Sequence, residues 1–162
     1  MPATTTPLLN SLEKRALEVY CELKPSDDAE VLRHIGAMIV CVGLGGNGGF
    51  VGGVVENSAR EDDPMINHMV DAFRFFGLNE HAELMLRGER EYARFRPNGD
   101  DDLNEADEAV WDELDETFYA VVTEESIEAA LQKHTHLLPL KHTPLQTVQH
   151  TVKRLLTQNK AL

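Results

Sequence analysis

The stretch Val31–Gly48, VLRHIGAMIVCVGLGGNG, decides between two fold classes for this chain of 162 residues. Its last six residues, GLGGNG from Gly43, have the G-x-G-x-x-G spacing that in a dinucleotide-binding sheet follows a strand and opens a helix. The apolar residues before them recur every three or four positions as far as Val42, which is the period of a helix. The stretch therefore predicts a helix over 26–43 and then a glycine-rich connection over 43–53.

The rest of the chain gives helix signals of the same kind. Each further pattern begins at a capping residue or a proline, and most end at a glycine or a proline. These patterns predict helices over 7–24, 64–76, 79–96, 104–121, 123–133 and 144–158. A doubly wound sheet needs several strands that alternate with helices, and only 120–122 has strand character after the glycines. We expect an all-α fold, a single compact domain over 1–162 with about six to seven helices and a Gly-rich connection after the second.

Composition places the protein among soluble intracellular chains. Hydrophobic residues make up 42% and charged residues 27%, which is ordinary for a globular domain. The cysteines are Cys21 and Cys41, and the first nine residues, MPATTTPLL, lack the basic and apolar parts of a signal peptide. The longest apolar stretch, 37–55, is interrupted by Gly and Asn, so we expect no membrane span. These features predict a cytoplasmic protein with reduced thiols.

The net charge of −13 is concentrated in one segment, residues 100–128, which we call the acidic block. The block holds 13 acids and no Lys or Arg, whereas the segments before and after it carry −5 and +5 and cancel. A one-sign block is usually a disordered tail. Here apolar and aromatic residues such as Trp111 and Phe118 recur through it at helical spacing. We therefore expect the acidic block to be mainly an amphipathic helix.

The charges on this helix are not relieved within the block. Glu108 and Asp112 are four residues apart, as are Asp112 and Glu116, and like-charge pairs at that spacing each cost roughly 0.2–0.5 kcal/mol. As one helix, the block of 29 residues would extend about 43 Å, with one carboxylate per about 3.3 Å. DNA carries one phosphate per about 3.4 Å along each strand. This similarity favours a surface that imitates a nucleic-acid strand over a face that only keeps the protein soluble.

Other motifs do not complete a metal or catalytic site. Asp100, Asp102 and Asn104 alternate as in a calcium loop, but the required Gly and Glu are replaced by Glu105 and Trp111. The C-terminal histidines lack Cys or carboxylate residues at ligand spacing; they are His134, His136, His142 and His150. Nucleophile-elbow, P-loop and zinc-protease motifs are missing from the sequence. We expect no catalytic residue, no metal and no cofactor.

Several short motifs resemble a bacterial all-helical domain family that includes DNA mimic protein nineteen. They lie within 47–119 and are Asn47-Gly-Gly-Phe50, Asn57-Ser58, Ala72-Phe-Arg-Phe-Phe-Gly77 with Ala82, Glu83, Leu84 and Leu86 in the following helix, and Leu114-Asp-Glu-Thr-Phe-Tyr119. The chain departs from the family pattern at 51–56, VGGVVE, where the family has a bulkier segment that contains aromatic residues. The resemblance implies an all-helical, dimeric acidic protein that acts as a decoy for a DNA-binding transcription regulator.

We therefore predict a non-enzymatic DNA mimic. Its partner would be a basic DNA-binding protein such as a transcription regulator, and the chain would form a homodimer that binds neither nucleic acid nor membranes. The residues predicted to imitate phosphates are Asp100, Asp101, Asp102, Glu105, Glu108, Asp112, Asp115, Glu116, Glu124, Glu125 and Glu128. A second candidate patch consists of Glu61, Asp62 and Asp63.

Two other hypotheses remain open at this point. One is an enzyme or nucleotide-binding module that uses the glycine-rich segment Gly43–Gly49. The other is an acidic immunity or assembly protein that binds a basic protein without DNA-like geometry. Stabilisation by a nucleotide would favour the first, because a ligand of the native state raises its stability. Competition between DNA and the chain for one partner separates mimicry from the second.

Overall fold

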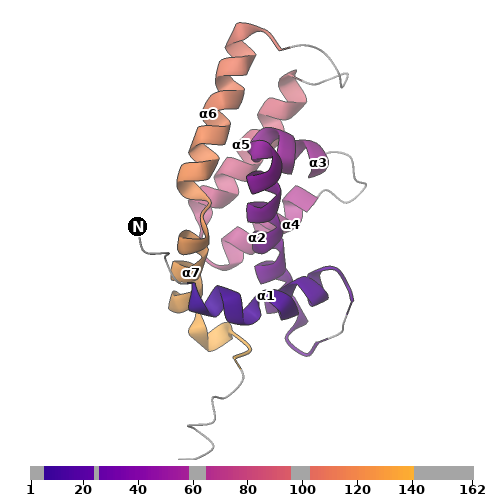
Figure 1. Ribbon diagram of the computed structural model, residues 1–162, viewed down its shortest axis with the longest axis vertical. Coiled ribbons are helices and arrows are strands. Elements are labelled where there is room, and N and C mark those ends of the chain that lie inside the picture. The colour runs from indigo at the N-terminus through magenta and orange to yellow at the C-terminus, as the bar shows by residue number, and fades with distance from the viewer. Residues whose placement is uncertain (1–5, 24–25, 59–64, 96–102, 141–162) are drawn as a thin grey trace, which may run out of the picture.

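The computed structural model describes residues 6–23, 26–58, 65–95 and 103–140. All regular elements in these ranges are helical, which confirms the predicted all-α class (Figure 1). They are α1 (Pro7–Tyr20), α2 (Ala29–Gly48), the π-helical η1 (Gly49–Val55), α3 (Glu56–Ser58), α4 (Met65–Phe75), α5 (Asn79–Phe95), α6 (Glu105–Val121), α7 (Glu124–Lys133) and the 3-10 turn η2 (Thr135–Leu137). The helix predicted over 144–158 lies outside the described residues.

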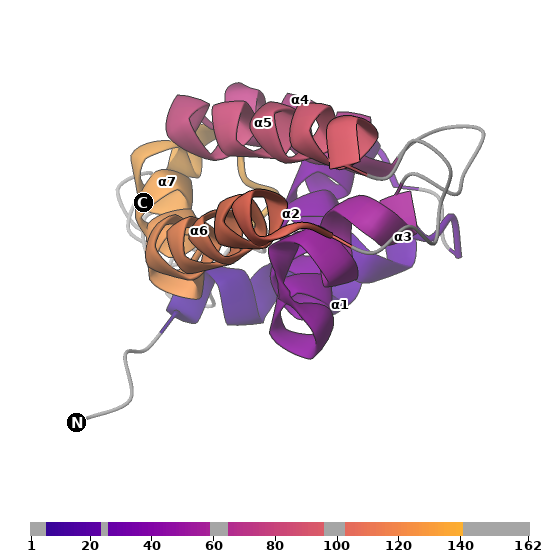
Figure 2. The same ribbon diagram turned by 90° about the horizontal axis from the view of Figure 1, so that it is seen from above.

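Helix α2 is the centre of the molecule. It packs on α1 and α4 and continues into η1, and it lies between the other helices when the molecule is seen from above (Figure 2). Its residues Leu32, Ile35 and Met38 are fully buried. Gly36 lets α1 cross it closely, because a β-carbon at this position would lie 2.7 Å from the carbonyl oxygen of Ala16. The apolar period that predicted a helix from the sequence is therefore the face that builds the core.

The glycine-rich segment is itself helical, which corrects the predicted helix end at Gly43. Helix α2 continues to Gly48, and η1 follows it through Val55 after a change of backbone direction at Gly49, whose φ is 75°. Glycine has a low helix propensity, which is why the sequence predicted a break at Gly43. Two of the glycines allow close packing, because the ring of Phe118 fills the space at Gly45 and the carbonyl of Leu44 lies against Gly53. The G-x-G-x-x-G motif thus lies inside a helix and does not follow a strand.

The helical run Ala29–Ser58 is long and apolar enough, by length and composition alone, to cross a membrane, and its most apolar window of 18 residues has a mean hydropathy of 1.7. The glycines at 43–46 do not interrupt α2, whereas the backbone leaves helical geometry at Gly48 and Gly49. In the fold, however, this run supplies core residues such as Ile35, Met38 and Cys41, which are fully buried against neighbouring helices. Packing inside the protein accounts for part of this apolar composition, because 44% of the window is buried.

Local signals placed most other helix ends correctly. Asn104 caps α6, where its Oδ1 accepts hydrogen bonds of 3.0 Å from the backbone N–H groups of Ala106 and Asp107. Thr123 caps α7 through a reciprocal pair of hydrogen bonds with Ser126. Two ends differ, because α1 stops at Tyr20 instead of residue 24, and α2 begins at residue 29 instead of 26.

Candidate acidic interaction surface

Helix α6 carries most of the acidic block and lies beside α5 along the long axis of the molecule (Figure 1). Its inner side is fixed by Leu114 and Phe118, which are buried. The Phe118 ring stacks on the Phe50 ring of η1, with 5.1 Å between the ring centroids. These apolar contacts determine which carboxylates face the protein and which face solvent.

Two carboxylates of α6 are paired with arginines of α5, and one of them, Glu113, is itself half exposed. Glu113 accepts a two-pronged ion pair from Arg87, one of whose hydrogen bonds is 2.8 Å long. Asp107 accepts a 2.6 Å hydrogen bond from Arg94. The hydrogen bonds from Arg87 lower the pKa of the Glu113 carboxyl. The acidic block has no Lys or Arg of its own, but the fold supplies cations from α5. Arg87 is 26 residues from Glu113 along the chain, and Arg94 is 13 residues from Asp107.

Asp115 caps η1 and does not stand free on the surface. Its Oδ1 accepts hydrogen bonds from the backbone N–H groups of Phe50 at 2.8 Å and Val51 at 2.9 Å. Its carboxylate also fills the space beside Gly49, whose φ of 75° is the left-handed conformation that favours glycine. Because both contacts are structural, Asp115 is removed from the predicted phosphate-mimicking set.

Glu128 is also removed from that set, because it is only 5% exposed. Its two carboxylate oxygens accept hydrogen bonds from the backbone N–H groups of Leu8 at 3.2 Å and Leu9 at 2.9 Å. These are unpaired donors at the N-terminus of α1, where a negative charge is favourable. The N-cap residue of α1, Thr6, makes no side-chain capping bond, so a residue of α7 takes that role.

Four carboxylates of α6 remain, and we call them the α6 acidic row. They are Glu105, Glu108, Asp112 and Glu116, all of them exposed. Their spacings of three and four residues put them in one stripe opposite the buried side of the helix. None of the four has an ion pair or a side-chain hydrogen bond with the described part of the chain.

Other predicted site residues extend this surface or lie outside the described ranges. Glu124 and Glu125 are exposed in the first turn of α7. Asp100, Asp101 and Asp102, like the second patch of Glu61, Asp62 and Asp63, fall outside the described residues. The surface that the structure defines therefore consists of the α6 acidic row and the first turn of α7.

The carboxylate spacing differs from the spacing expected from the sequence. The α6 acidic row covers eleven residue steps, or about 17 Å at 1.5 Å per residue, which gives one carboxylate per about 5.5 Å. The sequence-based interval of about 3.3 Å counted paired and buried acids and treated the block as one helix. The first assumption fails because Asp107 and Glu113 are paired and Glu128 is buried. The second fails because α6 ends at Val121. The row has the sign and linear form of a nucleic-acid strand, but not one charge per phosphate.

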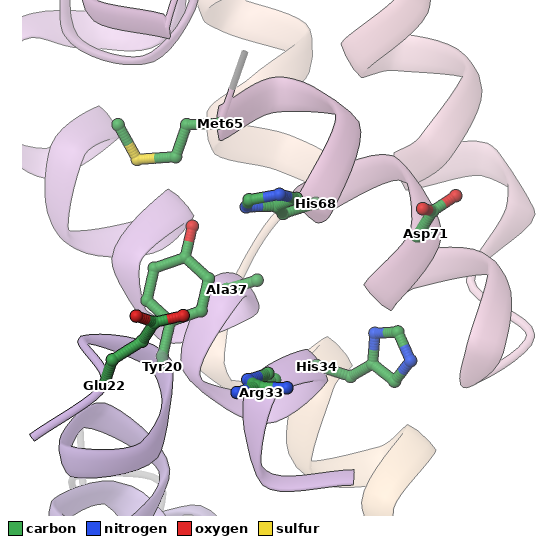
Figure 3. Close-up of a pocket in the computed structure, with 8 residues that line it drawn as sticks. All are labelled: Tyr20, Glu22, Arg33, His34, Ala37, Met65, His68 and Asp71. Carbon is green, nitrogen blue, oxygen red and sulfur yellow. The ribbon is translucent and has the colours of Figure 1, made fainter. Parts of the chain in front are cut away.

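A pocket lies away from this surface and from the glycine-rich segment. It has a volume of about 540 Å³ and is lined by residues of α1, α2 and α4 and by Glu22 just after α1, including Tyr20, Arg33 and His68 (Figure 3). His34 also lines it and stacks on Phe75, and burial lowers the pKa of this imidazole. Within the described residues, no group of three or more His, Cys, Asp or Glu side chains is placed to hold a metal ion.

Comparison with known proteins gives one match. A family model described as DMP19-like protein matches residues 27–134. The match covers α2 to α7, which includes the α6 acidic row and the whole of the 47–119 segment in which the resemblance was noticed. Searches of curated proteins and of solved structures found no match.

Proposed function

Because the chain belongs to the DMP19-like protein family, we propose that it is a non-enzymatic DNA mimic whose acidic surface occupies the DNA-binding site of a basic protein. The observation that carries this proposal is the α6 acidic row, which is exposed and has no described partner. Asp107 and Glu113 on the same helix are paired with arginines of α5, whereas the four carboxylates of the row are not. The row is therefore available to a partner outside the chain.

Electrostatics explains how such a row would act. Glu108, Asp112 and Glu116 repel one another at four-residue spacing, at roughly 0.2–0.5 kcal/mol per pair. A basic surface that evolved to hold phosphates would relieve this repulsion. Complementary charge also steers the encounter and speeds association, especially at low salt. Occupation of the site by the row would exclude DNA.

The proposed binding residues are the α6 acidic row together with Glu124 and Glu125. We assign the partner to DNA-binding proteins such as transcription regulators. We also propose a homodimer, which is what the family resemblance implies. A cytoplasmic location agrees with the two free cysteines, of which Cys21 is exposed and Cys41 is buried.

The experiment that tests mimicry is competition with DNA. The full chain is immobilised, proteins are captured from native cytosol, and the column is eluted with duplex DNA of about 20 base pairs. Release of a captured protein by DNA, together with direct binding of that protein to DNA, supports the proposal. Release by salt but not by DNA would favour an acidic immunity or assembly protein.

A matched pair of variants tests the surface. The first neutralises the row (E105Q, E108Q, D112N, E116Q), and the control neutralises four exposed acids elsewhere (D27N, E30Q, D71N, E80Q). Both change the net charge by the same amount. Loss of capture only in the first variant supports the row, whereas equal loss in both would show that net charge alone is responsible.

A further inference from the structure

A small groove opens between α1, α2 and α7. Its volume is about 180 Å³, and its walls include Leu9 of α1, Ile39 and Val42 of α2, and Ile127 of α7. Sites for small organic ligands are commonly about 300–1,000 Å³. The groove is therefore the size of a single side chain and not of a metabolite.

Two carboxylates from different helices line this apolar groove. Glu13 comes from α1 and Glu124 from the first turn of α7, and both are exposed. Within the described residues neither of them has an ion pair. A groove with apolar walls and two carboxylates at its surface suits a long cationic side chain. Such a side chain buries its methylene stem against the walls and keeps its charged group in water near the carboxylates.

We infer that the groove receives an arginine side chain of the protein partner. Arginine suits it better than lysine, because its planar and weakly hydrated guanidinium can donate hydrogen bonds to two carboxylates at once. Arginine is also among the residues that most often act as buried anchors at interfaces. The inference rests on the proposed function and adds a contact that imitation of phosphates does not supply.

The groove shares a residue with the proposed binding surface. Glu124 lines the groove and is one of the exposed acids in the first turn of α7, which follows α6 directly along the chain. The groove keeps its shape because Glu128 of α7 holds the first turn of α1. A basic partner that lies along α6 would therefore reach the groove at the end of the row.

Two glycines of α2 give a matched test. A β-carbon at Gly43 or at Gly46 meets no neighbouring atom within 4 Å, and both glycines are exposed, but only Gly43 lines the groove. Leucine at either position should fold at least as well, because leucine has the higher helix propensity. We expect Gly43→Leu to weaken binding of the DNA-releasable partner about tenfold or more, and Gly46→Leu to change it less than threefold.

A probe that needs no partner tests the groove directly. The full chain, labelled with ¹⁵N, is titrated to millimolar concentrations with N-acetyl-arginine amide and with its uncharged isostere N-acetyl-citrulline amide. We expect the arginine compound alone to shift the amide signals of Gly43 and Glu124. The double variant E13Q, E124Q should abolish these shifts.

The outcomes separate the groove from the mimic surface. If Gly43→Leu binds the partner as well as Gly46→Leu does, or if arginine amide gives no shift beyond citrulline amide, the groove inference is wrong. Loss of the partner in the row variant would still support the mimic. If instead no captured protein is released by DNA, the proposed function fails, while the arginine titration still decides whether the groove binds a guanidinium.

Discussion

The outer side of α6 holds the α6 acidic row in solvent without a described partner, whereas Asp107, Glu113 and Asp115 bind groups of α5 and η1. Both sets are carboxylates of the same 17-residue helix. They differ in their surroundings. Asp107 and Glu113 contact arginines of α5 and Asp115 contacts backbone N–H groups of η1, whereas the row contacts solvent. Acidic residues that are uniform in the sequence thus divide into structural and available groups.

The largest expected effect separates the two sides by binding. Neutralising the α6 acidic row should weaken the partner complex about 100-fold or more, which corresponds to about 2.7 kcal/mol. The same variant should change the free energy of unfolding by less than about 1 kcal/mol, because the relief of two like-charge spacings is offset by the loss of Glu105 and Glu108, which the helix dipole favours in the first turn of α6. Calorimetric titration at low salt and urea unfolding check the two parts. A large loss of stability would show that the row belongs to the fold.

Asp115 and Asp112, three residues apart, give the sharpest comparison of stability. Asp115→Ala leaves the N–H groups of Phe50 and Val51 without their acceptor, which should lower the free energy of unfolding by about 2–3 kcal/mol. Asp112→Ala removes an exposed charge and should change it by less than about 0.5 kcal/mol. Urea unfolding of both variants measures the difference. Equal values would contradict the division of α6 into two sides.

Glu128 extends the comparison to α7, with Glu125 as its exposed control. Glu128→Ala removes the acceptor for two N–H groups at the start of α1 and should cost about 1–2 kcal/mol, whereas Glu125→Ala should cost less than about 0.5 kcal/mol. Hydrogen exchange should show faster opening of the first turn of α1 in Glu128→Ala. Unchanged protection of Leu8 and Leu9 would contradict the capping role.

The smallest expected effect is a pH dependence from His81 of α5. Its Nε2 lies 2.9 Å from the hydroxyl oxygen of Ser126 in α7, and burial lowers the pKa of this imidazole. In the unfolded chain the imidazole of His81 has a pKa of about 6.5 and is protonated below that pH. In the folded chain it stays neutral to a lower pH, because its pKa is lowered. Stability should therefore be complete above this pH and fall as the pH is lowered towards the folded pKa.

This effect is limited because one proton is involved, at most about 1.4 kcal/mol per pH unit. Urea unfolding of the wild type and of His81→Gln between pH 7 and 5 isolates it, since ordinary carboxylates titrate near 4. Burial lowers the pKa of His34 as well, so His34→Gln is measured beside it to find how much of the pH dependence comes from that second histidine. Equal slopes in the wild type and His81→Gln would assign the effect to another group.

Local sequence signals predicted the elements well. The caps at Asn104 and Thr123 placed the starts of α6 and α7, because capping depends on residues within one turn. The helical period identified Leu114 and Phe118 as core residues. The glycines misled the prediction of the end of α2, since α2 continues to Gly48 and the ring of Phe118, 73 residues along the chain, occupies the space at Gly45, a contact that no local pattern records.

By itself the sequence determined that the chain is helical, that one segment carries the net charge, and that this segment folds with one apolar side. Only the tertiary structure decided which acids are available. It paired Glu113 with Arg87, turned Asp115 towards η1 and buried Glu128 against α1, and it left the α6 acidic row in solvent. The physical reason is that a carboxylate's partner is set by distance in space, and these partners are 26 to 120 residues away along the chain.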